Sequence, residues 1–123
     1  MSRPYIGVDI IEIGRIGEAV SNWNGHFLDR VYSKTELAQC EKRLPSLAAR
    51  FAAKEAVIKA LGSGFIESGW KDIEILSRQD GSPYIKLHGN VLEKANLLGL
   101  RDFSVSLSHC KDYAIAMLVS YAD

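Results

Sequence analysis

Residues 51–59 of the chain read Phe-Ala-Ala-Lys-Glu-Ala-Val-Ile-Lys, and the segment runs on into Gly62-Ser63-Gly64. The alanine-rich composition predicts a helix, because alanine is the strongest helix former. Side chains four residues apart share a helix face, so Glu55 and Lys59 should project the same way, one turn apart. Such a pair is typical of a solvated helix face. Beside a glycine loop it also suits a phosphate and a divalent cation, since Mg²⁺ prefers carboxylate oxygens.

The helices expected around this segment follow from apolar spacing and end signals. The long helix should open at Pro45-Ser46 and close at Gly62, a residue that tolerates a C-cap conformation. A first helix is expected from Ile13, Ile16, Val20 and Trp23, ending near Asn24-Gly25. Ser33-Lys34-Thr35-Glu36 reads as a capping box, which predicts a second helix that stops near residues 43–45. Another helix should span residues 91–98 and close at Gly99.

Alternating residues predict strands at both ends of the chain and in the middle. In residues 5–11, Asp9 lies on the face opposite Ile6, Val8 and Ile10. Residues 73–87 read as a hairpin with a turn at 79–82, and residues 103–119 as a second hairpin with a turn at 110–112. The last strand is apolar on both faces, so it should be central or covered, for example by another subunit. The pattern predicts an α+β fold with a mainly antiparallel sheet packed with helices.

Composition narrows the class of protein. The 123 residues are 47% hydrophobic, which suits one domain, residues 1–123, with its own core. The 15 basic residues balance the 15 acidic ones, so the net charge indicates no nucleic-acid partner. The N-terminal segment lacks a signal-peptide run and no apolar run reaches membrane-spanning length, so we expect a soluble, cytoplasmic protein without a membrane partner. Cys40 and Cys110 are too far apart in sequence for a CxxC zinc motif, and should be ordinary buried or half-buried thiols.

Three segments resemble, in chain order, the signature segments of the bacterial holo-acyl-carrier-protein synthases, a family of 4′-phosphopantetheinyl transferases. They are Ile-Gly-Val-Asp-Ile at residues 6–10, the segment 51–59, and Ser-Leu-Ser-His at residues 106–109. Residues 27–33 with Glu36, residues 70–75 and residues 81–83 are similar to further family segments, so the resemblance covers nearly the whole chain. It implies transfer of the phosphopantetheine arm of coenzyme A to a serine of an acyl carrier protein, with release of adenosine 3′,5′-bisphosphate.

The resemblance also implies roles for individual residues. Asp9 and Glu55 match the two carboxylates that hold Mg²⁺ in the family. Lys59 is similar to the lysine that reaches the phosphates, so the implied catalytic residues are Glu55 and Lys59. An unperturbed lysine is protonated near neutral pH, which favours an electrostatic role for Lys59. Whether the serine proton goes to Glu55, to Lys59 or to a metal-bound water stays open.

The remaining implied contacts concern the coenzyme and the carrier. The residues expected to contact the coenzyme are Arg50, Lys59, Gly62, Ser63, Gly64, Pro83 and His109. Arg15 and Arg30 are expected to dock the acidic carrier protein, although Arg30 can equally be a structural partner of Asp29 or Glu36. Lys54 gains no role from the resemblance and is expected to be a surface or interface lysine. The family assembles as homotrimers with active sites between subunits, which implies the same for this chain.

Two other classes of protein remain as alternatives. One is a non-catalytic oligomer that binds coenzyme A or a nucleotide, and the other is a structural oligomer with a solvated charged helix. A binding module does not need Asp9, Glu55 and Lys59 together, and a structural protein needs none of them. The complete set of motifs therefore favours the transferase.

Overall fold

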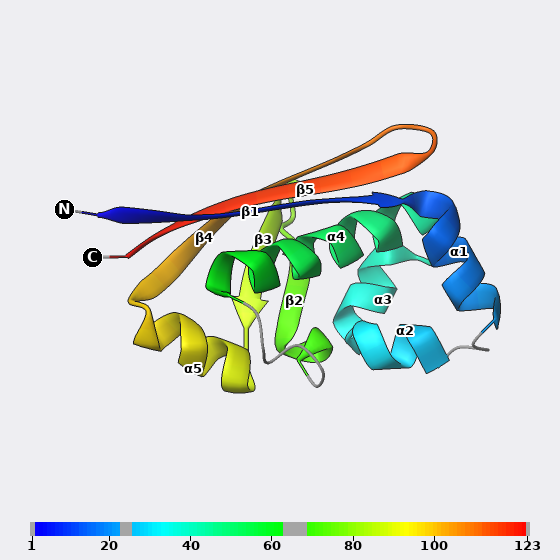
Figure 1. Ribbon diagram of the computed structural model, residues 1–123. Coiled ribbons are helices and arrows are strands. Elements are labelled where there is room, and N and C mark those ends of the chain that lie inside the picture. Colours follow the sequence, from blue (N-terminus) through cyan, green and yellow to red (C-terminus); the bar gives the residue numbers. More distant parts are fainter. Residues whose placement is uncertain (1, 23–25, 63–68, 123) are drawn as a thin grey trace.

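The structure is a computed structural model that describes residues 2–22, 26–62 and 69–122. Five strands and five helices alternate irregularly along the described part of the chain (Figure 1). In order they are β1 (Arg3–Glu12), α1 (Ile13–Asn22), α2 (His26–Val31), α3 (Lys34–Cys40), α4 (Leu44–Leu61), the 3-10 turn η2 (Trp70–Asp72), β2 (Ile73–Ser77), β3 (Pro83–Leu87), α5 (Gly89–Leu97), β4 (Leu100–His109) and β5 (Tyr113–Ala122).

The sheets are antiparallel throughout, which confirms the predicted fold class. The main sheet has the strand order β1-β5-β4, and β2 and β3 form a separate hairpin. The apolar strand β5 is therefore central, as its composition predicted. Figure 1 shows the helices gathered on one side of the main sheet, with α4 lying directly beneath it. None of the described helices or strands covers the other side of this sheet.

A glycine sets the distance between α4 and β1. A Cβ atom added to Gly7 would lie 1.9 Å from the carbonyl oxygen of Ala56, a contact that no side chain can make. The alternation of β1 places Asp9 and Ile11 on the same face as Gly7. The short residues Gly7 and Ala56 therefore bring the polar residues next to them close together.

The uncovered side of the sheet is apolar. Ile6, Val8 and Ile10 of β1 are 60%, 48% and 61% exposed, and they pair with Val119, Met117 and Ile115 of β5. We name these six residues the outer sheet face. The alternation in β1 was predicted correctly, but its more apolar side faces away from the core.

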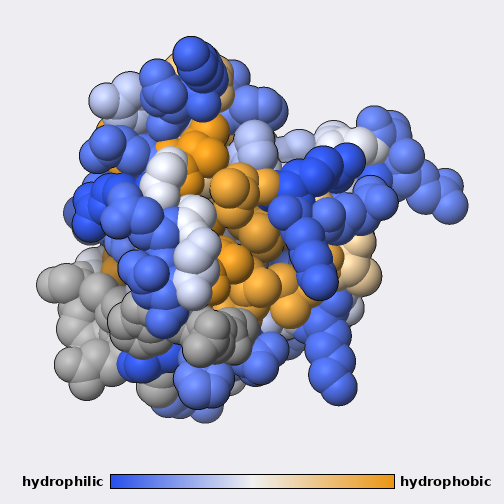
Figure 2. Space-filling model, turned by 90° about the vertical axis from the view of Figure 1, so that its right-hand side faces the viewer, coloured by the Kyte–Doolittle hydropathy of each residue, from blue (hydrophilic) through white to orange (hydrophobic). Residues whose placement is uncertain are grey.

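A second apolar area, seen as a band between hydrophilic side chains in Figure 2, lies at the end of the molecule that carries α1 and α2.

The core consists of two clusters of buried side chains, and α4 contributes to both. One cluster of buried side chains joins the middle and C-terminal part of α4 to β2, α5 and β5. A second cluster joins its N-terminal part to α1, α2 and α3. Alanines occupy many of these α4 positions, so neighbouring elements can approach the helix closely from several directions.

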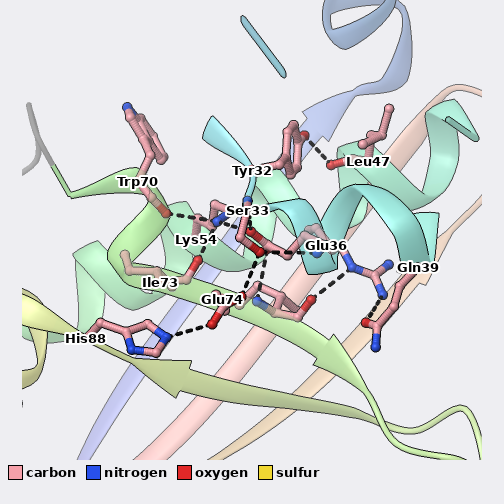
Figure 3. Close-up of polar contacts among 12 residues, drawn as sticks. Tyr32, Ser33, Glu36, Gln39, Leu47, Lys54, Trp70, Ile73, Glu74 and His88 are labelled. Atoms are coloured by element: carbon pink, nitrogen blue, oxygen red, sulfur yellow. Dashed lines mark hydrogen bonds and ion pairs between the residues drawn. The ribbon is translucent and has the colours of Figure 1, made fainter. Parts of the chain in front are cut away.

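A buried ion pair fixes α4 to α3 and β2. The Nζ of Lys54 lies 2.8 Å from Oε1 of Glu36, and both side chains are 0% exposed. The same ammonium donates to the carbonyl oxygens of Trp70 and Ile73, so its three N–H groups all have acceptors (Figure 3). Glu36 in turn accepts from the amides of Ser33 and Ile75. The expectation of a surface or interface position for Lys54 is therefore wrong within this chain.

Some predicted boundaries also differ from the structure. The capping box is formed, but α3 ends at Cys40, because Glu41 and Lys42 adopt positive φ angles of 52° and 61°. Helix α2 was not predicted, although Phe27, Leu28 and Val31 have helical spacing. Cys40 is buried, whereas Cys110 is exposed rather than half-buried. Trp23 and Asn24-Gly25, where the first helix was expected to end, lie outside the described residues.

None of the helices in the described part of the chain is both long and apolar enough to cross a membrane.

The buried ion pair gives a stability prediction. Lys54→Met removes one partner and leaves the Glu36 carboxylate buried without its cation, so the free energy of unfolding should fall by about 3–5 kcal/mol. Urea unfolding at a fixed protein concentration measures this change. Lys34→Met is the matched control, because Lys34 is an exposed lysine on α3, and it should change the free energy by less than about 0.5 kcal/mol.

The double variant Lys54→Met/Glu36→Gln separates the ion pair from packing. Its loss should be clearly smaller than the sum of the two single losses, since the uncompensated charge is gone. Additive losses, or a Lys54→Met variant as stable as Lys34→Met, contradict this interpretation.

Candidate functional site

The residues predicted to carry the chemistry come together where β1 crosses α4. The Nζ of Lys59 lies 2.7 Å from Oδ1 of Asp9 and also donates to the carbonyl oxygen of Val8 at 3.2 Å. Glu55 lies one turn before Lys59 on α4, and the charges of Asp9 and Lys59 both act on its carboxyl group. The ion pair of Lys59 is thus made with β1, and not with Glu55 along the helix.

The pKa values of Glu55 and Lys59 are both raised, but for different reasons. Burial raises the pKa of Glu55, and the negative charge of Asp9 raises it further, while Lys59 opposes the shift. The hydrogen bond to Asp9 raises the pKa of Lys59 above its ordinary value. Lys59 therefore stays protonated near neutral pH, and Glu55 is a stronger proton acceptor than an exposed glutamate.

The donor set fits Mg²⁺. Asp9 and Glu55 offer hard carboxylate oxygens from two different elements, and their mutual repulsion marks them as neighbours that a cation would stabilise. Within the described ranges, no three His, Cys, Asp or Glu side chains converge on a common point. Two carboxylates suit Mg²⁺, which is usually held by one or two carboxylates together with water and substrate phosphates.

A hollow of about 380 Å³ adjoins the two carboxylates. Its other lining residues include Arg15, Ile16 and Ala19 of α1. Phe27 and Phe51, whose ring centroids lie 5.9 Å apart, line it as well. We name it the β1 hollow. It combines an apolar wall with one exposed arginine beside the acidic pair. Its aromatic residues were not predicted as site residues.

His109 and Arg50 line a different hollow, of about 580 Å³, which we name the β4 hollow. Its remaining lining residues are Arg43, Pro45, Ser46, Ala49, Leu107 and Ser108. Arg50 is only 6% exposed, and its guanidinium donates to the carbonyl oxygen of Ile75 and to the hydroxyls of Ser46 and Ser77. Its structural bonds were not predicted. Arg43 was not predicted either, although its spacing from Ser46 and Arg50 is helical.

The two hollows lie on opposite faces of α4. Ser46, Ala49 and Arg50 share one face of the helix, whereas Phe51 and Glu55 project from the other. The sheet order agrees with this division, because β1 and β4 are the two outer strands on either side of β5. Within one chain, the predicted residues that line the two hollows therefore form two separate groups.

The other predicted residues take different positions. Gly62 follows α4 with a φ of 92°, which favours glycine, while Ser63 and Gly64 lie outside the described residues. Pro83 begins β3 and lines neither hollow. Arg30 is exposed on α2, and it is not the partner of Glu36, whose carboxylate bonds Lys54.

Comparisons with known proteins identify the family of the chain. A sequence profile of the 4′-phosphopantetheinyl transferase superfamily matches residues 5–118. A holo-[acyl-carrier-protein] synthase of Dehalococcoides mccartyi is 54% identical over 94% of this chain and 97% of its own length.

Solved structures give the same result. The crystal structure of Helicobacter pylori holo-[acyl-carrier-protein] synthase in complex with coenzyme A matches with a TM-score of 0.82 and 37% identity, over 94% of this chain and 98% of that one. The coenzyme A complex of the synthase from Chronobacterium ammoniagenes matches with a TM-score of 0.85 and 28% identity, over 98% of each chain. The chain belongs to the 4′-phosphopantetheinyl transferase superfamily, and within it to the family of holo-[acyl-carrier-protein] synthases.

Proposed function

We propose that this chain transfers the 4′-phosphopantetheine arm of coenzyme A to a serine of an apo acyl carrier protein. The observation that carries the proposal is the group of Asp9, Glu55 and Lys59, which lie together where β1 crosses α4 and occupy the matching positions of the family motifs. The coenzyme A complexes of the two solved relatives support the same donor. The products are the holo-carrier and adenosine 3′,5′-bisphosphate.

Asp9 and Glu55 would hold the Mg²⁺. When bound, this ion neutralises negative charge that develops on the diphosphate as its bond breaks. The ammonium of Lys59 lies beside the same carboxylates and would contribute a second positive charge toward the phosphates. Because its pKa is raised, Lys59 is suited to this electrostatic role and is a poor general base.

Glu55 is the candidate general base of this chain. A carboxylate has two oxygens, so the one that does not hold the cation can accept the serine proton while the serine oxygen bonds to phosphorus. The bond from phosphorus to the bridging oxygen of the diphosphate then breaks. Adenosine 3′,5′-bisphosphate leaves with the bonding electrons, so atoms and charge balance without another reactant.

The β1 hollow offers a surface for the carrier protein. Arg15 is exposed at its edge and would attract an acidic partner, while Phe27 and Phe51 offer an apolar wall. Arg30, exposed on the neighbouring helix α2, would extend this positive charge.

The β4 hollow would bind the nucleotide part of coenzyme A. His109 can donate a hydrogen bond to a phosphate oxygen, and Arg43 adds an exposed guanidinium at the same opening. Arg50, with its structural partners, would support this wall from beneath. Because this hollow lies across α4 from Asp9, we propose that one active site combines the β1 hollow of one copy with the β4 hollow of another.

The outer sheet face supports assembly of several copies. Its six side chains form a contiguous apolar surface on the two paired strands β1 and β5, and such surfaces commonly mark interfaces. Burial against another copy would remove this surface from water. We propose a homotrimer, the assembly that the family resemblance implies, acting in the cytoplasm.

The activity is tested by incubating the protein with coenzyme A, Mg²⁺ and several apo carrier proteins, and weighing the carriers by mass spectrometry. A gain of one phosphopantetheine supports the proposal. Unmodified coenzyme A and carriers of unchanged mass, in spite of measurable coenzyme A binding, favour the non-catalytic alternative.

Asp9→Asn and Glu55→Gln should each lower the rate of this transfer by at least about 100-fold, because each removes a charge from the reacting centre. Glu93→Gln is the matched control, since Glu93 is exposed on α5, and its rate should equal that of the unchanged protein. Circular dichroism should be the same for all three variants. A folded Asp9→Asn or Glu55→Gln protein with near-normal turnover removes that residue from the catalytic group.

Val8→Asp should convert the assembly to single chains in light scattering, because it buries a charge in the outer sheet face. Leu97→Asp is the control, since Leu97 is an 85% exposed leucine on α5, and it should leave the mass unchanged. A wild-type protein of single-chain mass, or an unchanged mass for Val8→Asp, contradicts the assembly.

A further inference from the structure

Asp9, one of the two carboxylates assigned to the metal, already pairs with a positively charged side chain of this chain. The ammonium of Lys59 lies 2.7 Å from Oδ1 of Asp9, and the side chain of Asp9 is only 16% exposed. A second bond, to the carbonyl oxygen of Val8 at 3.2 Å, holds the ammonium in this position. Lys59 therefore covers an oxygen that the proposed function gives to Mg²⁺.

The lysine is able to leave this position. Its side chain is 55% exposed, in contrast to Lys54, which is completely buried five residues earlier on the same helix. A lysine side chain is a point charge on a flexible four-carbon stem. Movement of Lys59 needs no change in the core, because the lysine end of the ion pair is the exposed end.

The positive charge of Lys59 stabilises the site because Glu55 lies close to Asp9. Asp9 and Glu55 both line the β1 hollow, so their negative charges repel one another. Lys59 carries the opposite charge, lies one turn from Glu55 on α4 and bonds directly to Asp9. It therefore offsets the repulsion between the two carboxylates that the proposed function assigns to one divalent ion.

We infer that Lys59 is an exchangeable counter-ion, which competes with the divalent cation for Asp9 and is released toward the phosphates when that cation binds. This inference rests on the proposed function, in which Asp9 holds the metal and Lys59 meets the diphosphate. Entry of the metal then does two things at once. It fills the acidic pair and it frees the one lysine in the group to act on the substrate.

The test measures metal binding without any turnover. Mn²⁺ is titrated into the complete protein in the absence of coenzyme A and carrier, and free Mn²⁺ is followed by electron paramagnetic resonance. Lys59→Met should tighten Mn²⁺ binding by about fivefold, the fold-change that corresponds to loss of one competing ion pair. Arg15→Met is the matched control, because it removes one positive charge that lines the hollow beside Asp9 and Glu55 without removing an ion pair to Asp9. It should tighten binding by less than about twofold.

A second measurement follows the lysine directly. In protein with isotope-labelled lysine side chains, the Lys59 ammonium resonance should shift on addition of Mg²⁺, while that of Lys86, an exposed lysine on β3, should stay in place. In Asp9→Asn the Lys59 shift should be lost.

Equal Mn²⁺ affinities for Lys59→Met and Arg15→Met, together with a Lys59 resonance that Mg²⁺ does not move, overturn the exchange. They do not affect the transferase proposal, which the carrier mass tests independently. Absence of Mn²⁺ binding to every variant overturns both the exchange and the assignment of Asp9 to the metal.

Discussion

The close contact between Gly7 and Ala56 is the constraint on which the candidate site depends. A hydrogen is the largest group that fits at Gly7, because a Cβ there would lie 1.9 Å from the carbonyl oxygen of Ala56. Asp9 follows on the same face of β1, while Glu55 precedes Ala56 and Lys59 lies three residues beyond it. Any larger residue at position 7 must push the strand and the helix apart, and the ion pair between Asp9 and Lys59 would open with them.

A second restraint fixes how α4 is rotated. The buried pair of Lys54 and Glu36 ties one side of the helix to α3 and to β2, so the adjacent Glu55 turns toward β1. The same rotation turns Arg50 to the opposite hollow, where its guanidinium bonds β2. One helix therefore supplies groups to two surfaces that face away from each other. A site that needs both surfaces has to be completed by another copy of the chain.

Most of the fold was predictable from local signals, and the site was predictable in part. Alternation and turn residues indicated the strands, and the capping box at Ser33 predicted the start of α3. The role of Lys54 was not predictable, because a buried lysine in an alanine-rich helix has the same local pattern as a solvated one. Its partner Glu36 is 18 residues away, and only tertiary packing brings the two together. For the same reason, spacing suggested Glu55 as the partner of Lys59, whereas the structure pairs Lys59 with Asp9.

The most direct test of the combined site is complementation between two defective variants. Asp9→Asn disables the β1 hollow and His109→Ala the β4 hollow, so each variant alone should transfer phosphopantetheine slowly. Mixed oligomers made by co-expression should recover activity well above the sum of the two, because some sites combine an intact half from each chain. Asp9→Asn mixed with Glu55→Gln, which damage the same half, should show no recovery. An Asp9→Asn and His109→Ala mixture that is no more active than its components would contradict the account.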